Sequence, residues 1–286
     1  MINFWLASRE KPGADRDMFD FEWGVIHVAL MLTTPSVMEG FVKYSQHRSP
    51  DDVPDELFVY GKHEKQWYSI ANHLMRDISD LQKIFSGEDY PRRMTPHSFG
   101  DKEFVIELTR VLTDRTFGAG PQPGRGVKVV NFLSAAEDVD RDTFERVARE
   151  EHAERIFAVA EHSDDIRRYI LNVQLPLDAA MFNGTLFELG GVQTYTAVEE
   201  LWFPSVEAAE RFRLACAADP ELRAVEDTII DRDRSFSMVA VERVVWDYSG
   251  SDAPPRPAID SRDSVEAGTL ASERKWGDWN TILPES

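Results

Sequence analysis

Two histidines occupy matching places in two helical patterns, and imidazole is the side chain best suited to proton transfer near neutral pH. Phe19, Trp23 and His27 follow one another at intervals of four residues, so they share one face of a predicted helix. The same spacing returns 125 positions later, with alanine in place of tryptophan, at Phe144, Ala148 and His152. We expect His27 to be a general acid–base group and His152 to be its counterpart in a second copy. The alternative is that both histidines only satisfy hydrogen bonds in the core.

A third candidate, His73, lies in the apolar stretch 68–75, which is predicted to be a strand. A polar side chain at a buried strand position is either hydrogen-bonded or functional. We therefore expect His73 to complement His27, and Glu200 is the residue of the second copy that aligns with it. Strand alternation puts Tyr68 and His73 on opposite faces, so they are not expected to serve one site.

Large aromatic side chains are concentrated in the first copy. Most of them are expected to build core, and a subset that faces a cavity would bind a flat, apolar ligand. The residues assigned to such a pocket are Trp5, Phe19, Trp23, Tyr44 and Tyr68. Because the second copy loses the tryptophan and surrounds His152 with acidic residues, we expect the pocket in the first copy, beside Trp23 and His27.

The sequence lacks the usual motifs for metal and nucleotide binding. It contains no H-x-x-H or H-E-x-x-H pattern, and a single cysteine, Cys216, excludes a cysteine cluster. The glycine-rich stretch 117–126 is interrupted by prolines, so it is no dinucleotide-binding loop. We expect neither a metal nor a cofactor. The alternatives are a haem with His152 or His73 as axial ligand, and a three-histidine metal site assembled in space. His47 is a further candidate for chemistry.

The elements that must position these residues follow the order β-α-β-β-α-β twice. Ser205 or Ser79 is expected to be the N-cap of the helix that follows a third strand. The predicted strands of the first copy are residues 2–8, 38–48, 68–75 and 103–112, and those of the second are 127–134, 166–175, 195–203 and 237–246.

Composition shifts divide the chain into four parts. The stretch FGAGPQPGRG is expected to be a flexible connector, and the Pro- and Ser-rich stretch after Tyr248 is expected to be irregular. The last residues carry Trp276 and Trp279, so we expect this end to dock on the body or on a second chain. The predicted parts are a first unit (1–116), a linker (117–126), a second unit (127–248) and a tail (249–286).

Several strands are apolar on both faces, as in the run from Val127 to Leu133. A four-stranded sheet with both helices on one face leaves its other face bare, and such strands need cover on both sides. The other copy is the natural cover. The predicted fold class is therefore α+β, with two ferredoxin-like units packed sheet to sheet.

These patterns resemble the EthD-like proteins of the dimeric α/β-barrel superfamily. Besides the F-x3-W-x3-H motif and its degenerate copy, the stretch YTAVEELWFPSVEAAERF (195–212) is similar to the third strand and following helix of that family. The resemblance covers roughly residues 2–248. It implies that both halves of the barrel, which separate chains form elsewhere in the superfamily, are supplied here by one chain.

The resemblance also implies a range of activities. The family includes cofactor-free lyases, cyclases, dehydratases and monooxygenases that act on aromatic or polyketide-like molecules, and some distant branches bind haem. We expect a cofactor-independent lyase, dehydratase or cyclase that works by general acid–base chemistry. The alternatives are a cofactor-free monooxygenase on the same scaffold and a non-catalytic carrier of an apolar metabolite.

Charge and composition limit the partners. Lys and Arg total 32 against 51 Asp and Glu, a net charge of −19, so the surface repels nucleic acids and anionic membranes. No apolar run is long enough for a transmembrane helix, and the N-terminus lacks the pattern of a signal peptide. We expect a cytoplasmic protein whose partner is an apolar or aromatic small molecule. Any homo-oligomer would form through other faces or the C-terminal tail.

Overall fold

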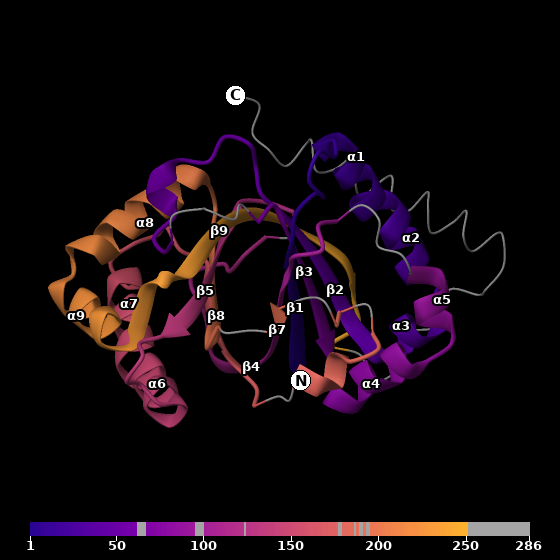
Figure 1. The fold of residues 1–286 in the computed structure, drawn as a ribbon. Helices are drawn as coiled ribbons and strands as arrows, with labels where there is room; N and C mark the ends of the chain where they lie inside the picture. Colours follow the sequence, from indigo (N-terminus) through magenta and orange to yellow (C-terminus); the bar gives the residue numbers. More distant parts are fainter. Residues whose placement is uncertain are drawn as a thin grey trace.

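Eight antiparallel strands close into a barrel, and helices cover it on two opposite sides (Figure 1). The structure is a computed structural model that describes residues 1–61, 67–94, 100–122, 124–176, 179–185, 187–188, 191–192 and 195–250. The short strand β7 (Gly191–Val192) pairs in parallel with β4, outside the ring. The strands of the ring are β1 (Ile2–Ser8), β2 (Phe41–Arg48), β3 (Ser69–Met75), β4 (Val105–Thr116), β5 (Val127–Ala135), β6 (Arg168–Gln174), β8 (Ala197–Phe203) and β9 (Ile230–Asp247).

The strands of each half stay together in the ring. Its order is β1-β3-β2-β9-β5-β8-β6-β4, and β4 pairs back with β1. Numbered by their order along the chain, the four strands of each half therefore lie side by side in the order fourth, first, third, second. This is the strand order of a ferredoxin-like unit. The halves join through two seams, β2 with β9 and β4 with β6. The α+β class and the barrel are confirmed, whereas the division into ferredoxin-like units and the four-part boundaries stay predictions.

Two local predictions need correction. The second strand begins at Phe41 rather than at residue 38, because α3 (Pro35–Gly40) occupies the preceding residues and has proline in its first turn. The N-cap of α4 (Ile78–Ser86) is Asp77 rather than Ser79, because the Asp77 carboxylate accepts a hydrogen bond from the backbone N–H of Ser79. Ser205 does cap α8 (Val206–Ala218), as predicted.

Each half packs its own helices on the outer face of its own strands (Figure 1). No described helix is long and apolar enough to cross a membrane. A 3-10 turn η4 (Ala179–Phe182) follows β6. The remaining first-half helices are α1 (Arg16–Phe21), α2 (His27–Leu32) and α5 (Asp89–Met94), and those of the second half are α6 (Arg141–Val147), α7 (Ala153–Ala160) and α9 (Pro220–Ile229).

The helix that carries each motif histidine contains a π-helical turn. The turn η1 (Glu22–Ile26) joins α1 to α2 immediately before His27, and η3 (Ala148–His152) joins α6 to α7. Such turns are rare and are often found at functional sites. Their recurrence at the same place in both halves supports the repeat that the histidine spacing indicated.

The barrel interior combines an apolar layer with a buried charged cluster. Trp5, Val130 and Phe132 belong to the apolar layer. Beside it, Lys128 is 2% exposed and contacts the carboxylates of Glu200 and Glu242. The Lys128 ammonium also lies 4.2 Å from the centre of a ring of Trp202.

His47 completes this cluster. Its Nε2 lies 2.9 Å from the Lys128 ammonium and 3.2 Å from a Glu242 oxygen. Burial and the Lys128 charge lower the pKa of His47, so the ring is neutral at neutral pH. Burial opposes ionisation of Glu242, but Lys128 and His47 outweigh it and hold the pKa of that carboxyl well below its usual value. His47 is therefore a neutral member of an ion cluster inside the barrel.

Replacing Lys128 with methionine should destabilise the protein by about 3–5 kcal/mol, because two carboxylates lose their buried counter-charge. The free energy of unfolding in urea measures this loss. Lys83→Met is the matched control, since Lys83 is exposed and its ion pair with Asp80 has little effect. Equal stability of the two variants would contradict a stabilising role for the cluster's cation.

Candidate active site

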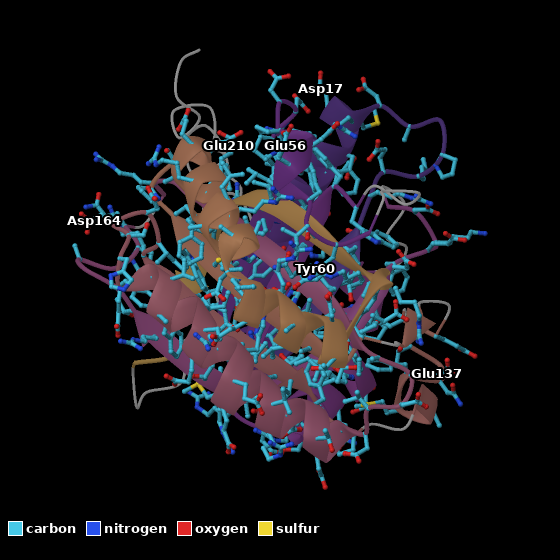
Figure 2. All side chains as sticks on the ribbon, turned by 90° about the vertical axis from the view of Figure 1, so that its left-hand side faces the viewer. Asp17, Glu56, Tyr60, Glu137, Asp164 and Glu210 are labelled. Carbon is cyan, nitrogen blue, oxygen red and sulfur yellow. The ribbon has the colours of Figure 1, made fainter. Side chains whose placement is uncertain are left out.

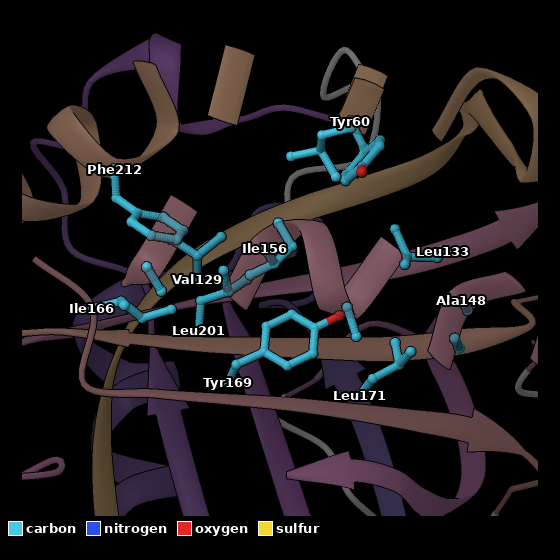
Figure 3. Packing of buried hydrophobic residues seen from close by; sticks show 14 of the residues in the cluster. Tyr60, Val129, Leu133, Ala148, Ile156, Ile166, Tyr169, Leu171, Leu201 and Phe212 are labelled. Carbon is cyan, nitrogen blue, oxygen red and sulfur yellow. The ribbon is translucent and has the colours of Figure 1, made fainter. Parts of the chain in front are cut away.

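A cavity of about 390 Å³ lies between the second-half helices and the outer face of β5 and β8. Its volume is in the range of small-molecule sites. Figure 3 shows several of the apolar side chains that pack in this layer. The apolar walls include Val129, Ile156, Leu201, Phe203 and Phe212. The sequence placed the pocket in the first half, but this cavity lies in the second.

A segment of the first half closes one side of the cavity. The connection from β2 to β3 carries the 3-10 turn η2 (Asp55–Leu57), and Leu57, Val59 and Tyr60 line the cavity. In Figure 1 this connection reaches α8, and Figure 2 shows Tyr60 beside the second-half helices. Gly61 ends the segment with a φ of +66°, and a Cβ there would lie 2.4 Å from the Ser235 carbonyl oxygen. Only glycine therefore fits this close crossing of β9.

His152 lies near the cavity between two carboxylates and is 1% exposed. Its Nε2 is 3.5 Å from Glu226 Oε1, and its Nδ1 is 3.8 Å from Glu199 Oε1. The hydroxyl of Tyr169 is 3.5 Å from the same Nδ1. Glu199 and Glu226 also line the cavity, so the acidic side of this cluster faces its interior.

The carboxylates decide the protonation of His152. Burial disfavours the imidazolium, but the hydrogen bond to Glu226 and the charges of Glu199 and Glu226 outweigh burial and raise the pKa of His152 above 6.5. Burial likewise opposes ionisation of Glu226, yet His152 and Arg232 lower the pKa of that carboxyl. Arg232 donates to Glu226 Oε2 at 2.5 Å. The cluster thus favours the protonated form of His152 and the ionised form of Glu226.

The carboxyl group of Glu199 is held in place by a chain of hydrogen bonds. The side-chain amide of Asn131 donates a hydrogen bond of 2.7 Å to Glu199 Oε2. The Ser237 hydroxyl in turn donates a hydrogen bond of 2.7 Å to the side-chain oxygen of Asn131. Glu199 Oε1 is buried and lies 3.8 Å from His152 Nδ1, and Tyr169 is hydrogen-bonded to the same carboxyl group.

Two tyrosines complete the cluster as neutral donors. Tyr60 donates to Glu226 Oε1 at 3.3 Å. Burial, together with the nearby carboxylates, raises the pKa of Tyr60 and of Tyr169 well above 10. Both phenols therefore keep their protons at neutral pH. The site combines two carboxyl groups, a histidine and two phenols beside an apolar space, and such groups can transfer protons.

The first half keeps only part of this arrangement. His27 is half-buried, and its ring centre lies 6.5 Å from that of Tyr44. The spacing of the repeat makes Tyr44 the counterpart of Tyr169. Leu6 and Ala71 pair across β1 and β3 where Asn131 and Glu199 pair across β5 and β8. The histidine–tyrosine pair is therefore repeated, but the carboxylate beside it is not.

The predicted alignment of His73 with Glu200 is wrong by one residue. His73 pairs with Phe4, whereas Leu201 holds the corresponding place opposite Val129. Glu200 pairs with Val130 and faces the barrel interior. The error follows from strand alternation, because a shift of one residue moves a side chain to the other face of the sheet.

His73 is surrounded by aromatic rings. It stacks on Tyr44 with ring centres 4.6 Å apart and lies 4.6 Å from the ring centre of Phe41. Burial lowers the pKa of His73 to about 3, so the ring is neutral at neutral pH. His73 and His27 thus flank Tyr44, but a proton-transfer role for this pair stays a prediction.

The aromatic residues assigned to a pocket lie in three different places. Trp5 lies inside the barrel and donates to Thr109 at 2.9 Å. Phe19, Trp23 and Tyr68 form a cluster of their own. The Tyr68 hydroxyl in that cluster donates to Asp20 at 2.9 Å. Tyr44 lies with His27 and His73, so these five side chains do not form one wall.

Sequence reasoning missed Glu199, Glu226, Asn131 and Tyr60. The consecutive acidic residues 199–200 in an otherwise apolar strand were a usable signal, because alternation sends them to opposite faces. Nothing in the sequence indicated Tyr60, whose segment belongs to the other half. The predicted docking of Trp276 and Trp279 falls outside the described residues.

The described residues do not fit a haem or a metal. Both ring nitrogens of His152 contact side-chain oxygens, and the ring of His73 is packed between aromatic rings. Neither imidazole therefore presents a nitrogen to an open space. Among the described residues, no group of three or more His, Cys, Asp or Glu side chains could hold a metal ion.

His152 should titrate above 6.5, and Glu226→Gln should lower its pKa. Since the folded-state pKa is raised, the stability that His152 contributes relative to His152→Gln is fully present below pH 6.5. That contribution is lost as the pH rises through the folded-state pKa. NMR of ¹³C-labelled histidine and urea unfolding from about pH 5.5 to about pH 9 measure both effects. His73 is the internal control, and a His152 pKa below 6.5 would contradict the ion pair.

Comparisons with known proteins agree with the barrel. Residues 136–233 match the EthD domain. An anthrone oxidase-like protein of known structure has a TM-score of 0.54 and 13% identity, over 88% of this chain and 96% of that one. A mutant chlorite dismutase from Candidatus Nitrospira defluvii has a TM-score of 0.48 and 10% identity, over 94% and 95% of the two chains. No curated protein matches significantly in sequence. Part of the second half thus matches the EthD domain, and the likeness to the anthrone oxidase-like structure shows the barrel fold of the chain.

Proposed function

We propose that the second-half cavity is the active site of an enzyme that removes a proton from an apolar or aromatic small molecule and returns one. The observation that supports this most directly is the buried His152, held between Glu199 and Glu226 beside an apolar space. A carrier would gain nothing from placing two carboxyl groups beside its ligand, because burying polar groups is costly. Enzymes, in contrast, use such groups for proton transfer.

Each residue has a separate role in this proposal. Glu199 takes the proton, because it lines the cavity and Asn131 holds it in place through one oxygen. Glu199 gives the proton back in the second step, and His152, which does not line the cavity, holds the two carboxyl groups in position. Tyr60 and Arg232 hold Glu226, which favours the protonated form of His152.

Two reaction classes share this first step. In a lyase, dehydratase or cyclase, the anion expels a leaving group or attacks a carbonyl within the same molecule. In a cofactor-free monooxygenase, the anion transfers electrons to O₂. One structural neighbour is named an anthrone oxidase-like protein, and this name supports the oxidative class as well as the lyase class is supported.

We further propose that residues 1–116 and 127–248 are two ferredoxin-like units, which the strand order of each half supports.

Anthrone is a suitable probe, because it is flat, apolar and has an acidic methylene. The enzyme should accelerate exchange of the methylene protons in D₂O under nitrogen, above the rate in buffer. Glu199→Gln should lower this acceleration by roughly 10²–10⁴-fold, the usual contribution of a positioned acid or base. His152→Gln should lower it as well, because the carboxyl groups lose the side chain that holds them in position. Mass spectrometry follows the exchange. His27→Gln is the matched control from the other half and should retain the activity.

Admitting air to the same samples separates the two classes. An oxidase would convert anthrone and O₂ to anthraquinone and water, with one O₂ consumed per anthrone. A lyase or cyclase would exchange protons without consuming O₂. Loss of exchange in His27→Gln, with full activity in His152→Gln, would place the active site in the first half. Thermal unfolding of each variant excludes a loss of activity caused only by instability.

A further inference from the structure

We infer that the ligand of the second-half cavity carries a carboxylate, which Arg213 and Arg223 bind at the mouth. Arg213 lies on α8 and Arg223 on α9, and both line the cavity. Arg213 is half-buried and Arg223 is exposed, whereas Glu199 is buried. The inference rests on the proposed function, because it assigns a substrate class to the same site.

The two arginines differ from the other charged groups of the cavity. Arg232 is engaged by Glu226 at 2.5 Å and by Asp227 at 3.2 Å. Arg213 and Arg223, in contrast, make no hydrogen bond or ion pair with the residues that the structure describes. The Nε atom of Arg213 is shielded from solvent and has no acceptor among them. A buried donor without an acceptor in the protein favours an acceptor on the ligand.

Arg213 differs from the exposed arginines that also lack a described partner, because it is half-buried and its Nε is shielded from solvent. Acidic residues outnumber basic ones by 51 to 32, so partners for arginine are abundant. Arg211, two residues before Arg213 on α8, binds Asp165 at 2.6 Å. A net charge of −19 repels an anionic ligand. Such a ligand would therefore need positively charged side chains at the mouth of the cavity in order to bind.

The charges also fix the orientation of the ligand. A guanidinium group binds a carboxylate through two parallel hydrogen bonds, so the arginines would hold the charged end at the mouth. Leu201 and Phe212 offer apolar surface to the body of the ligand. Glu199 and Glu226 repel a second anionic group, so the uncharged end points toward His152. The ligand class is therefore an aromatic acid whose reactive carbon lies away from its carboxylate.

Binding of two anthracene probes tests this without any turnover. Anthracene-9-carboxylate should bind more tightly than its neutral amide, as measured by fluorescence titration at low salt. Arg213→Gln and Arg223→Gln should each weaken carboxylate binding by about tenfold and leave amide binding within about twofold. The double variant should bind both probes equally. Arg211→Gln is the matched control on the same helix and should keep the preference.

Several outcomes would overturn the inference. These are equal binding of the two probes to the unaltered protein, a carboxylate preference that survives in the double variant, and no binding of either probe. Circular dichroism excludes misfolding of the variants. The proposed function fails separately, since loss of proton exchange on anthrone would leave the carboxylate preference unchanged.

Discussion

The two seams that close the barrel are the constraint on which the remaining structure depends. Each half alone would leave a bare sheet face and two unpaired edges, which are unstable in water. Pairing of β2 with β9 and of β4 with β6 satisfies all four edges in one step. The inner faces then share one core, and the outer faces are left to the helices. The cavity lies between α8 and α9 and the outer face of β5 and β8.

The sequence predicted the framework well because periodicity and repetition are local signals. The eight strands, the Ser205 cap and the matched histidines could all be read from spacing. The register between strands could not, because it depends on pairing partners far apart in the chain. For this reason His73 was aligned with Glu200, although Glu200 faces the barrel interior.

The choice between the two halves shows a second limit of sequence reasoning. The loss of tryptophan at Ala148 and the acidic residues near His152 were interpreted as drift. In the folded chain it is two other carboxylates, Glu199 and Glu226, that lie within ion-pair distance of His152. The acidic residues adjacent in sequence lie on the helix surface and give no information about this contact.

The crossing of the β2–β3 connection over β9 has an evolutionary consequence. In a barrel made from two identical chains, every substitution is made twice, so a loop that serves the neighbour's cavity cannot change without changing both sites. Covalent fusion removes this symmetry. Here Tyr60 and Gly61 of the first half complete the second half's cavity. Substitutions in the first half can thus be selected for their effect on the second-half cavity, although the first half has no matching carboxylate in its own helix layer.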